Sequence, residues 1–268
     1  MNYWNQSKTN IYVAAHRGWR SAFPENTMSA FKAALELGVD QLETDVRISA
    51  DGELVLIHDK TVDRTTNGKG LVREMTLEQL RALDAGSYKG EQFKGEKIPT
   101  LIEFMELVKN HPTITLDIEL KEYTYDVGEE LSHSVCDRVL KIIDDYGFSD
   151  RVVINTFDGM LHEYINEKYG DKYRLHVYYP IGNLKKVTRN PYDYAYCCCM
   201  FRAFYDKLNM ATKSEFEIMA SYGVQPWAGA CVTDEKGVDR AIEAGATLIT
   251  CDNPDVILEL LRKKGYHK

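Results

Sequence analysis

Residues 41–46 read QLETDV, a short β-rich run in which a single residue separates Glu43 from Asp45. Successive side chains of a strand point to opposite faces, so these two carboxylates leave the same face. Residues 113–121 read TITLDIELK and repeat this pattern with three charged residues, Asp117, Glu119 and Lys121. Charged groups inside a protein are costly unless they are paired or bind a metal. The two runs therefore predict a charged site in the interior of the fold.

Outward from these runs, β-rich segments alternate with amphipathic helical stretches along the chain. Eight strands are predicted, at residues 11–15, 41–46, 113–120, 151–156, 174–178, 195–200, 224–230 and 247–251. The clearest helices are predicted at residues 27–37, 128–146, 159–169, 213–222, 236–244 and 254–263. Strands that each precede a helix, eight times over, are the signature of a closed parallel barrel. The predicted fold class is α/β, a (β/α)8 barrel of the TIM type.

The alternation is interrupted between Lys60 and Pro99, where glycines and charges surround one short helical pattern at Thr76–Leu83. Residues 53–57 continue the second strand after an Asp51-Gly52 turn, so we expect a small insertion after that strand, an inserted subdomain at about 60–98. A further short helix is predicted at residues 181–190. No Pro/Gly/Ser-rich linker divides the sequence, which favours a single domain over residues 1–268.

The composition is that of an ordinary globular protein, with 44% hydrophobic and 28% charged residues. The net charge of −8 argues against nucleic acid or an anionic membrane surface as a partner. Residues 1–10 are polar and lack the apolar core of a signal peptide, and no run is long enough for a membrane span. Cys197–Cys199 are interpreted as small buried residues of a strand, and we expect a cytoplasmic protein without stable membrane insertion.

The working residues of such barrels lie at the carboxyl ends of the strands. The first predicted strand runs into His16-Arg17-Gly18, and the extension of the second ends in His58-Asp59. Two imidazoles suit one proton donor and one proton acceptor near neutral pH. Arg17 offers a planar donor fork that suits phosphate, and Lys121 offers a point charge.

Three carboxylates, those of Glu43, Asp45 and Glu119, are hard oxygen ligands suited to one divalent cation, Mg²⁺ or Ca²⁺. Such an ion would also give a net-negative protein a local positive centre for an anionic substrate. Taken singly, each residue has a simpler interpretation, such as an internal Glu119–Lys121 ion pair. Their joint occurrence at strand ends favours a site. The remaining histidines are interpreted as surface or structural residues: His111, His133, His162, His176 and His267.

Seven motifs, in their order along the chain, resemble those of the glycerophosphodiester phosphodiesterases, a family of phospholipase C-like TIM barrels. The resemblance rests on the HRG at 16–18, PENT at 24–27, ETDV at 43–46, HD at 58–59, DRTT at 63–66, PTL at 99–101 and IELK at 118–121. It implies a barrel with an inserted subdomain. It also implies metal ligation by Glu43, Asp45 and Glu119, and acid–base catalysis by His16 and His58.

The resemblance further implies phosphate contacts for Arg17 and Lys121. The expected reaction converts a small-molecule glycerophosphodiester into sn-glycerol 3-phosphate and an alcohol, as in lipid and glycerol metabolism. Asn26 is expected to N-cap the following helix. Trp227 stands where the family carries a W-T-V-N stretch, and it is expected either to line the alcohol pocket or to fill the core. Cys251-Asp252-Asn253-Pro254 replaces the family's T-D-x-P, with Cys251 in place of threonine.

Two other functions remain open at this point. One is phospholipase D-like action on lysolipids or sphingolipids, which the absence of an apolar docking segment disfavours. The other is a barrel that binds a phosphate ligand without turnover, which the presence of both histidines and all three carboxylates disfavours. A barrel aldolase is disfavoured because the acidic neighbours of Lys121 would keep it charged and poorly nucleophilic.

Overall fold

The computed structural model describes residues 3–4, 7, 9–204 and 207–268. Within this part of the chain, eight parallel strands close into a barrel, because β1 pairs with both β2 and β10. The barrel strands are β1 (Tyr12–Ala15), β2 (Gln41–Ile48), β4 (Thr115–Leu120), β5 (Val152–Asn155), β6 (Arg174–Tyr179), β7 (Cys197–Phe204), β9 (Gln225–Ala228) and β10 (Leu248–Cys251). The predicted (β/α)8 barrel is confirmed.

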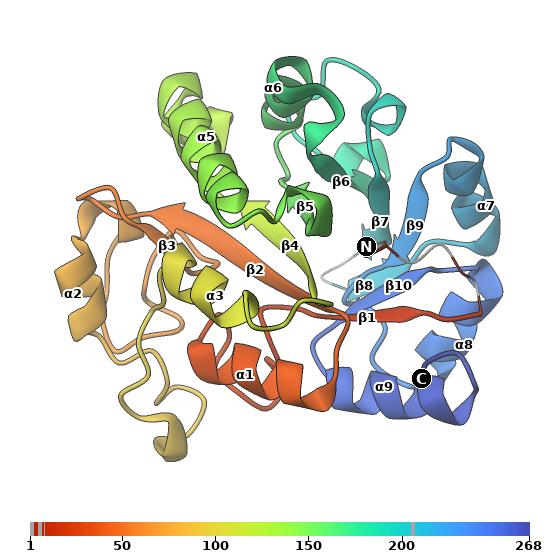
Figure 1. Ribbon diagram of the computed structural model, residues 1–268, viewed down its shortest axis with the longest axis horizontal. Helices are drawn as coiled ribbons and strands as arrows, with labels where there is room; N and C mark the ends of the chain where they lie inside the picture. Colours follow the sequence, from red (N-terminus) through yellow and green to blue (C-terminus); the bar gives the residue numbers. More distant parts are fainter. Residues whose placement is uncertain (1–2, 5–6, 8, 205–206) are drawn as a thin grey trace.

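Helices surround the barrel (Figure 1). They are α1 (Met28–Leu37), α3 (Leu101–Val108), α5 (Glu129–Asp145), α6 (Gly159–Tyr169), α7 (Lys213–Ser221), α8 (Glu235–Ala244) and α9 (Pro254–Lys263), with a single turn, α4, at Thr124–Val127. The sequence prediction missed α3, although Thr100 and Glu103 form a capping box at its start. Its apolar face is buried against the barrel.

After β2, the chain reverses direction and runs alongside β2 before it forms the segment outside the barrel. β3 (Leu54–Leu56) pairs antiparallel with β2, and the chain then forms α2 (Leu77–Ala82), whose N-cap is Thr76 as predicted. This inserted segment has a hydrophobic cluster of its own: Val55, Ile57, Val62, Val72, Leu80, Ala85 and Ile98. In Figure 1 it lies beyond β3, at the far side from α7 and α8.

Two loops differ from the prediction. Residues 181–190 form no α-helix in the described chain, only a short 3-10 turn at Ile181–Asn183, and Leu184 and Val187 pack on the core without helical structure. β7 runs on past the barrel rim and pairs antiparallel with β8 (Lys207–Met210), a hairpin that the sequence analysis did not predict. Cys197–Cys199 are buried in β7, as predicted. None of the described helices is both long and apolar enough to cross a membrane.

The barrel interior is divided into an apolar lower part and a polar upper part. The lower part is a cluster of buried apolar side chains, Trp4, Ala14, Val153, Cys197, Trp227 and Leu248. Nearer the carboxyl ends of β2 and β4, the interior positions belong to charged residues instead. Interior positions recur at every second residue of a strand. The change from apolar to charged along one face therefore marks where the core ends and the site begins.

Candidate active site

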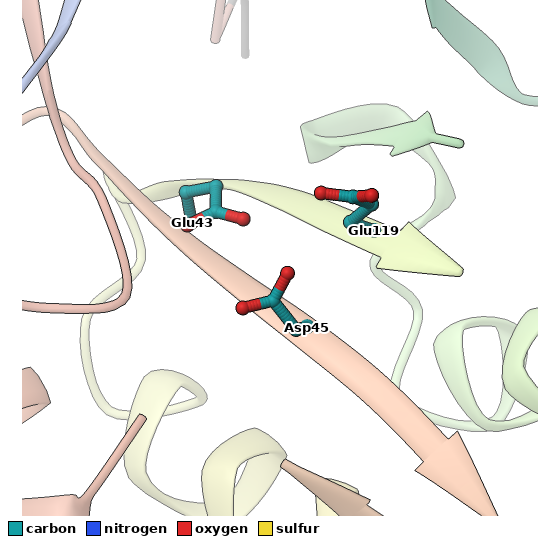
Figure 2. A group of neighbouring side chains, drawn as sticks. All are labelled: Glu43, Asp45 and Glu119. Carbon is teal, nitrogen blue, oxygen red and sulfur yellow. The ribbon is translucent and has the colours of Figure 1, made fainter. Parts of the chain in front are cut away.

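Glu43, Asp45 and Glu119 lie side by side in the upper barrel, as Figure 2 shows. Parallel pairing of β2 with β4 sets Asp45 opposite Glu119, which brings the two carboxylates together. The oxygen atoms that the three residues can offer a cation lie within 4.8 Å of one another, and all three side chains are buried. The metal ligands predicted from sequence are thus brought to one point.

The negative charge of this cluster is only partly neutralised by the protein. Lys121 Nζ lies 2.6 Å from Glu119 Oε1 and 3.1 Å from Asp45 Oδ1. Burial alone would raise the pKa of Asp45, but Lys121 and Arg17 hold it well below its usual value. For Glu43, burial together with repulsion from Asp45 outweighs the charge of Arg17 and raises the pKa well above its usual value. A hard divalent cation would relieve this repulsion, so the three residues fit one.

Arg17 is oriented by the backbone of the first loop. It has a left-handed φ of 57°, and its backbone N–H donates to Glu43 Oε2 at 2.7 Å. Gly18 follows with φ 76°, and a Cβ at this position would lie 2.8 Å from the backbone of Ala30 in α1. Only glycine fits a left-handed turn packed so closely against a helix. The HRG sequence is therefore explained by geometry as well as by chemistry.

His16 lies at the end of β1 and is held by a residue from the opposite end of the chain. Its Nδ1 lies 2.6 Å from Asp252 Oδ1, just after β10, and its Nε2 lies 4.0 Å from Glu43. Burial lowers the pKa of His16 below its usual value, and the hydrogen bond to Asp252 opposes this shift. Asp252 orients the ring with Nε2 toward the carboxylate cluster, an arrangement suited to proton transfer.

His58 has an equivalent partner. It follows β3, and its Nδ1 lies 2.7 Å from Oδ1 of the adjacent Asp59. Burial lowers the pKa of His58, while the negative charge of Asp45 opposes the shift. Asp59 in turn accepts two hydrogen bonds from Arg64, at 2.7 and 3.0 Å. In both candidate catalytic histidines, Nδ1 is thus hydrogen-bonded to a carboxylate, which leaves Nε2 available for proton transfer.

Glu25, which sequence reasoning placed on the first loop without a role, connects the two histidine–aspartate pairs. Its buried carboxylate contacts three arginines: Arg17 at 2.8 Å, Arg64 at 2.7 and 2.8 Å, and Arg20 at 3.4 Å. Burial would raise its pKa, but the hydrogen bonds from Arg64 and the charges of Arg17 and Arg20 lower it to about 2. Since Arg20 also lies 3.5 Å from Asp252, the network reaches both histidines.

Asn26 was expected to cap α1, and this expectation was wrong. The N-cap is Thr27, whose Oγ1 accepts from the backbone N–H of Ala30. Asn26 instead turns inward with φ 54°, donates to Asp45 Oδ2 at 2.8 Å and accepts from Thr44 Oγ1 at 2.9 Å. It fixes one oxygen of a candidate metal ligand. Thr27 also begins the helix one residue later than an Asn26 cap would, which leaves Asn26 free to do this.

The charged cluster opens into a cavity of about 380 Å³ at the carboxyl ends of the strands. His16, Arg17, Glu43, His58 and Glu119 line one side. The other side is formed by residues that the sequence analysis did not single out as site residues, Asn155, Phe157, His176, Tyr178, Asn183, Cys199, Phe201, Ala230 and Thr250, and by Asp117. The alternation of side chains along each strand could have indicated that several of them point into the barrel. The sequence alone does not show how close each one lies to the carboxyl ends of the strands.

Trp227 does not line this cavity. It is 2% exposed and lies in the apolar lower cluster, stacked on Trp4 at a centroid distance of 6.4 Å. The expectation of a substrate contact is corrected to the core alternative, because β9 places this residue below the polar layer. His176, interpreted as surface or structural, lies above Trp227 and does face the cavity.

Fold and site together define a TIM-barrel phosphodiesterase: two histidines, an arginine and two members of a buried carboxylate cluster line one cavity, and a lysine is paired with that cluster. The model of the glycerophosphoryl diester phosphodiesterase family matches residues 16–256. This chain belongs to that family, and it is an enzyme that hydrolyses phosphoric diesters.

Relatives agree with this assignment, and a solved structure shares the fold. The chain is 36% identical to a glycerophosphodiester phosphodiesterase of Caldanaerobacter subterraneus, over 94% of this chain and 98% of that protein. It is 32% identical to a putative glycerophosphodiester phosphodiesterase of Bacillus subtilis, over 96% and 99%. Its fold is similar to that of an Oleispira antarctica phosphodiesterase in complex with sn-glycerol-3-phosphate, with a TM-score of 0.77, 24% identity and coverage of 94% and 97%.

Proposed function

We propose that this enzyme hydrolyses glycerophosphodiesters to sn-glycerol 3-phosphate and an alcohol, with a divalent cation and a pair of histidines. The observation that carries the proposal is the placement of His16 and His58, each bound to its own aspartate, on the cavity that the carboxylate cluster opens into. The Caldanaerobacter relative, a glycerophosphodiester phosphodiesterase, and the product bound to the Oleispira enzyme support the choice of substrate.

Glu43, Asp45 and Glu119 would hold one Mg²⁺ or Ca²⁺. When bound, the cation supplies a positive charge that polarises the phosphoryl group and stabilises charge in the transition state. Arg17 adds hydrogen-bond donors on the cavity wall. Lys121 lies next to Glu119 and Asp45, so it would add positive charge beside the cation. These groups give a net-negative protein a local site for an anionic substrate.

Proton transfer is assigned to the two histidines. In each ring Nδ1–H donates to an aspartate, so Nε2 remains available to the substrate. One histidine removes a proton from the attacking hydroxyl or water, and the other protonates the oxygen of the leaving alcohol. Because burial lowers both pKa values, the unprotonated form needed by the base is well populated at neutral pH. The aspartates then stabilise whichever imidazole becomes charged.

The proposal also covers the domain organisation of the enzyme and the compartment in which it works. Residues 1–268 form one catalytic unit, with the segment at about 60–98 as an inserted subdomain that contributes Arg64 to the site network. All six cysteines are free within the described structure, and five are buried. This supports a reducing compartment such as the cytoplasm as the place where the enzyme works.

The test is release of glycerol 3-phosphate from glycerophosphocholine and glycerophosphoethanolamine. It would be run with EDTA and with added Mg²⁺ or Ca²⁺, for wild type, His16→Ala and His58→Ala. His111→Ala is the matched control, because His111 lies outside the cavity lining. We expect metal-dependent release that is lost in the two site variants and kept in the control. Full activity in EDTA would overturn the metal assignment, and activity in either site variant would overturn the histidine pair.

A further inference from the structure

Beneath the metal-ligand layer, Asp117 and His176 meet across the interior of the barrel. Asp117 lies two residues before Glu119 on β4, and His176 lies on β6, with β5 between them. His176 Nδ1 is 2.7 Å from Asp117 Oδ2. The two residues are 1% and 3% exposed, and both line the cavity. They form its polar floor, below the reacting groups and above the apolar cluster around Trp227.

Each member of this pair has a second polar atom with no partner. Among the described residues, neither Asp117 Oδ1 nor His176 Nε2 makes a hydrogen bond, although both atoms are buried. A pair that served only to hold β4 and β6 together would be expected to satisfy both ends, because a buried polar atom without a partner is costly. Thr250 Oγ1, on the same cavity wall, is also buried without a partner.

The chemistry of these atoms selects a ligand. In the neutral imidazole whose Nδ1–H donates to Asp117, Nε2 of His176 is an acceptor, and Asp117 Oδ1 is likewise an acceptor. A hydroxyl group donates to such acceptors and can itself accept from Thr250. A trimethylammonium group has no N–H or O–H to donate, and it would leave all three atoms unsatisfied. The floor is therefore matched to hydroxyl groups, whereas Phe157, stacked on Tyr178 at 3.9 Å, adds an apolar surface beside His176.

We propose that Asp117 and His176 bind the hydroxyl groups of the glycerol arm of the substrate and so fix which side of the diester is the glycerol phosphate. This inference rests on the proposed function, because it assigns the arms of that substrate. The glycerol arm points to the floor and the alcohol head group toward the mouth. Recognition then depends on the shared glycerol and leaves the head group free to vary.

The test measures binding and does not depend on turnover. Calorimetry in the presence of Mg²⁺ or Ca²⁺ would compare glycerol 3-phosphate with ethyl phosphate, which has the same phosphate but no hydroxyl on its carbon chain. Wild type, His176→Phe and His176→Gln would be compared. Phenylalanine keeps a ring against Trp227 but cannot accept a hydrogen bond, whereas glutamine keeps a polar end. We expect wild type to prefer glycerol 3-phosphate at least tenfold, about the size of a lost hydrogen bond to a bound hydroxyl.

In His176→Phe the preference should fall to about threefold or less while ethyl phosphate binds as in wild type, and His176→Gln should lie between. An unchanged preference in both variants would overturn the assignment. An equal loss of affinity for both phosphates would also overturn it, since it would indicate a structural role. If His176→Phe does not fold, His176→Gln alone decides by the same criteria. Wild-type binding without release of glycerol 3-phosphate from diesters would count against the proposed reaction and leave the hydroxyl assignment standing.

Discussion

Arg64 and Glu25 form a two-pronged ion pair, with Arg64 Nη1 and Nη2 at 2.8 and 2.7 Å from the two carboxylate oxygens. Arg64 belongs to the inserted segment, and Glu25 belongs to the loop after β1. The same guanidinium also binds Asp59, the partner of His58. The insertion is therefore tied to the loop after β1 by a residue that also contacts the aspartate partner of a candidate catalytic histidine.

Replacement of Arg64 by lysine is expected to lower kcat/KM by about tenfold, because a point charge cannot serve two carboxylates in the planar geometry of a guanidinium. The thermal unfolding temperature should change little, since Arg64 is partly exposed. Steady-state kinetics and calorimetry would measure the two effects. Arg73→Lys, on the exposed surface of the same insertion, is the control. Equal kinetic losses in the two variants would argue against a positioning role for Arg64.

Replacement of Lys121 by methionine should have opposite effects on metal binding and on catalysis. Removal of its charge leaves Asp45 and Glu119 more negative, so the affinity for Mg²⁺ or Ca²⁺ should rise. Phosphodiester turnover should fall by about a hundredfold, because the transition state loses a nearby positive charge. Metal titration calorimetry and kinetics with saturating metal would separate the two. Weaker metal binding in this variant would show that the lysine helps to build the cation site.

Metal binding is expected to stabilise the fold. At a free metal concentration one hundred times Kd, the gain is about 2.7 kcal/mol, which EDTA would remove. Differential scanning calorimetry should therefore show a metal-dependent rise in the unfolding temperature of wild type. The rise should disappear in Glu43→Gln and in Asp45→Asn. A metal-dependent shift that survives in both variants would place the cation elsewhere.

Glu25 makes stability depend on acid pH. Its pKa is lowered from the ordinary value of 4.5 to about 2, so the folded state binds this proton less readily than the unfolded chain does. The resulting stabilisation is complete above pH 4.5 and is lost as the pH falls toward 2. The difference in unfolding free energy between wild type and Glu25→Gln should shrink over this range in denaturant titrations. A constant difference would mean that the charge of Glu25 is not what stabilises the network.

The sequence predicted those parts of the site that depend on local spacing. Glu43 and Asp45 share a face because they are two residues apart, and His16 and His58 follow strands. Contacts between side chains on different barrel strands could not be predicted from the sequence. Asp117 and His176 are 59 residues apart and meet only because β4 and β6 lie on either side of β5.

The position of Trp227 along the barrel axis could not be predicted from the sequence either. Its face of β9 follows from alternation, but its height depends on the stagger of neighbouring strands, which no local pattern encodes. Asn26 was misassigned for a different reason. Both Asn26 and Thr27 are good N-cap residues, and the choice was made by the tertiary hydrogen bond from Asn26 to Asp45.

The pairing of His16 with Asp252 joins positions 236 residues apart, at the strands that close the barrel. During synthesis, a chain that has not yet been extended past β10 carries every predicted metal ligand and both histidines, but His16 has no aspartate to orient it. The last barrel strand therefore leads into the residue that orients His16, and we expect full catalytic efficiency only from a chain that includes Asp252.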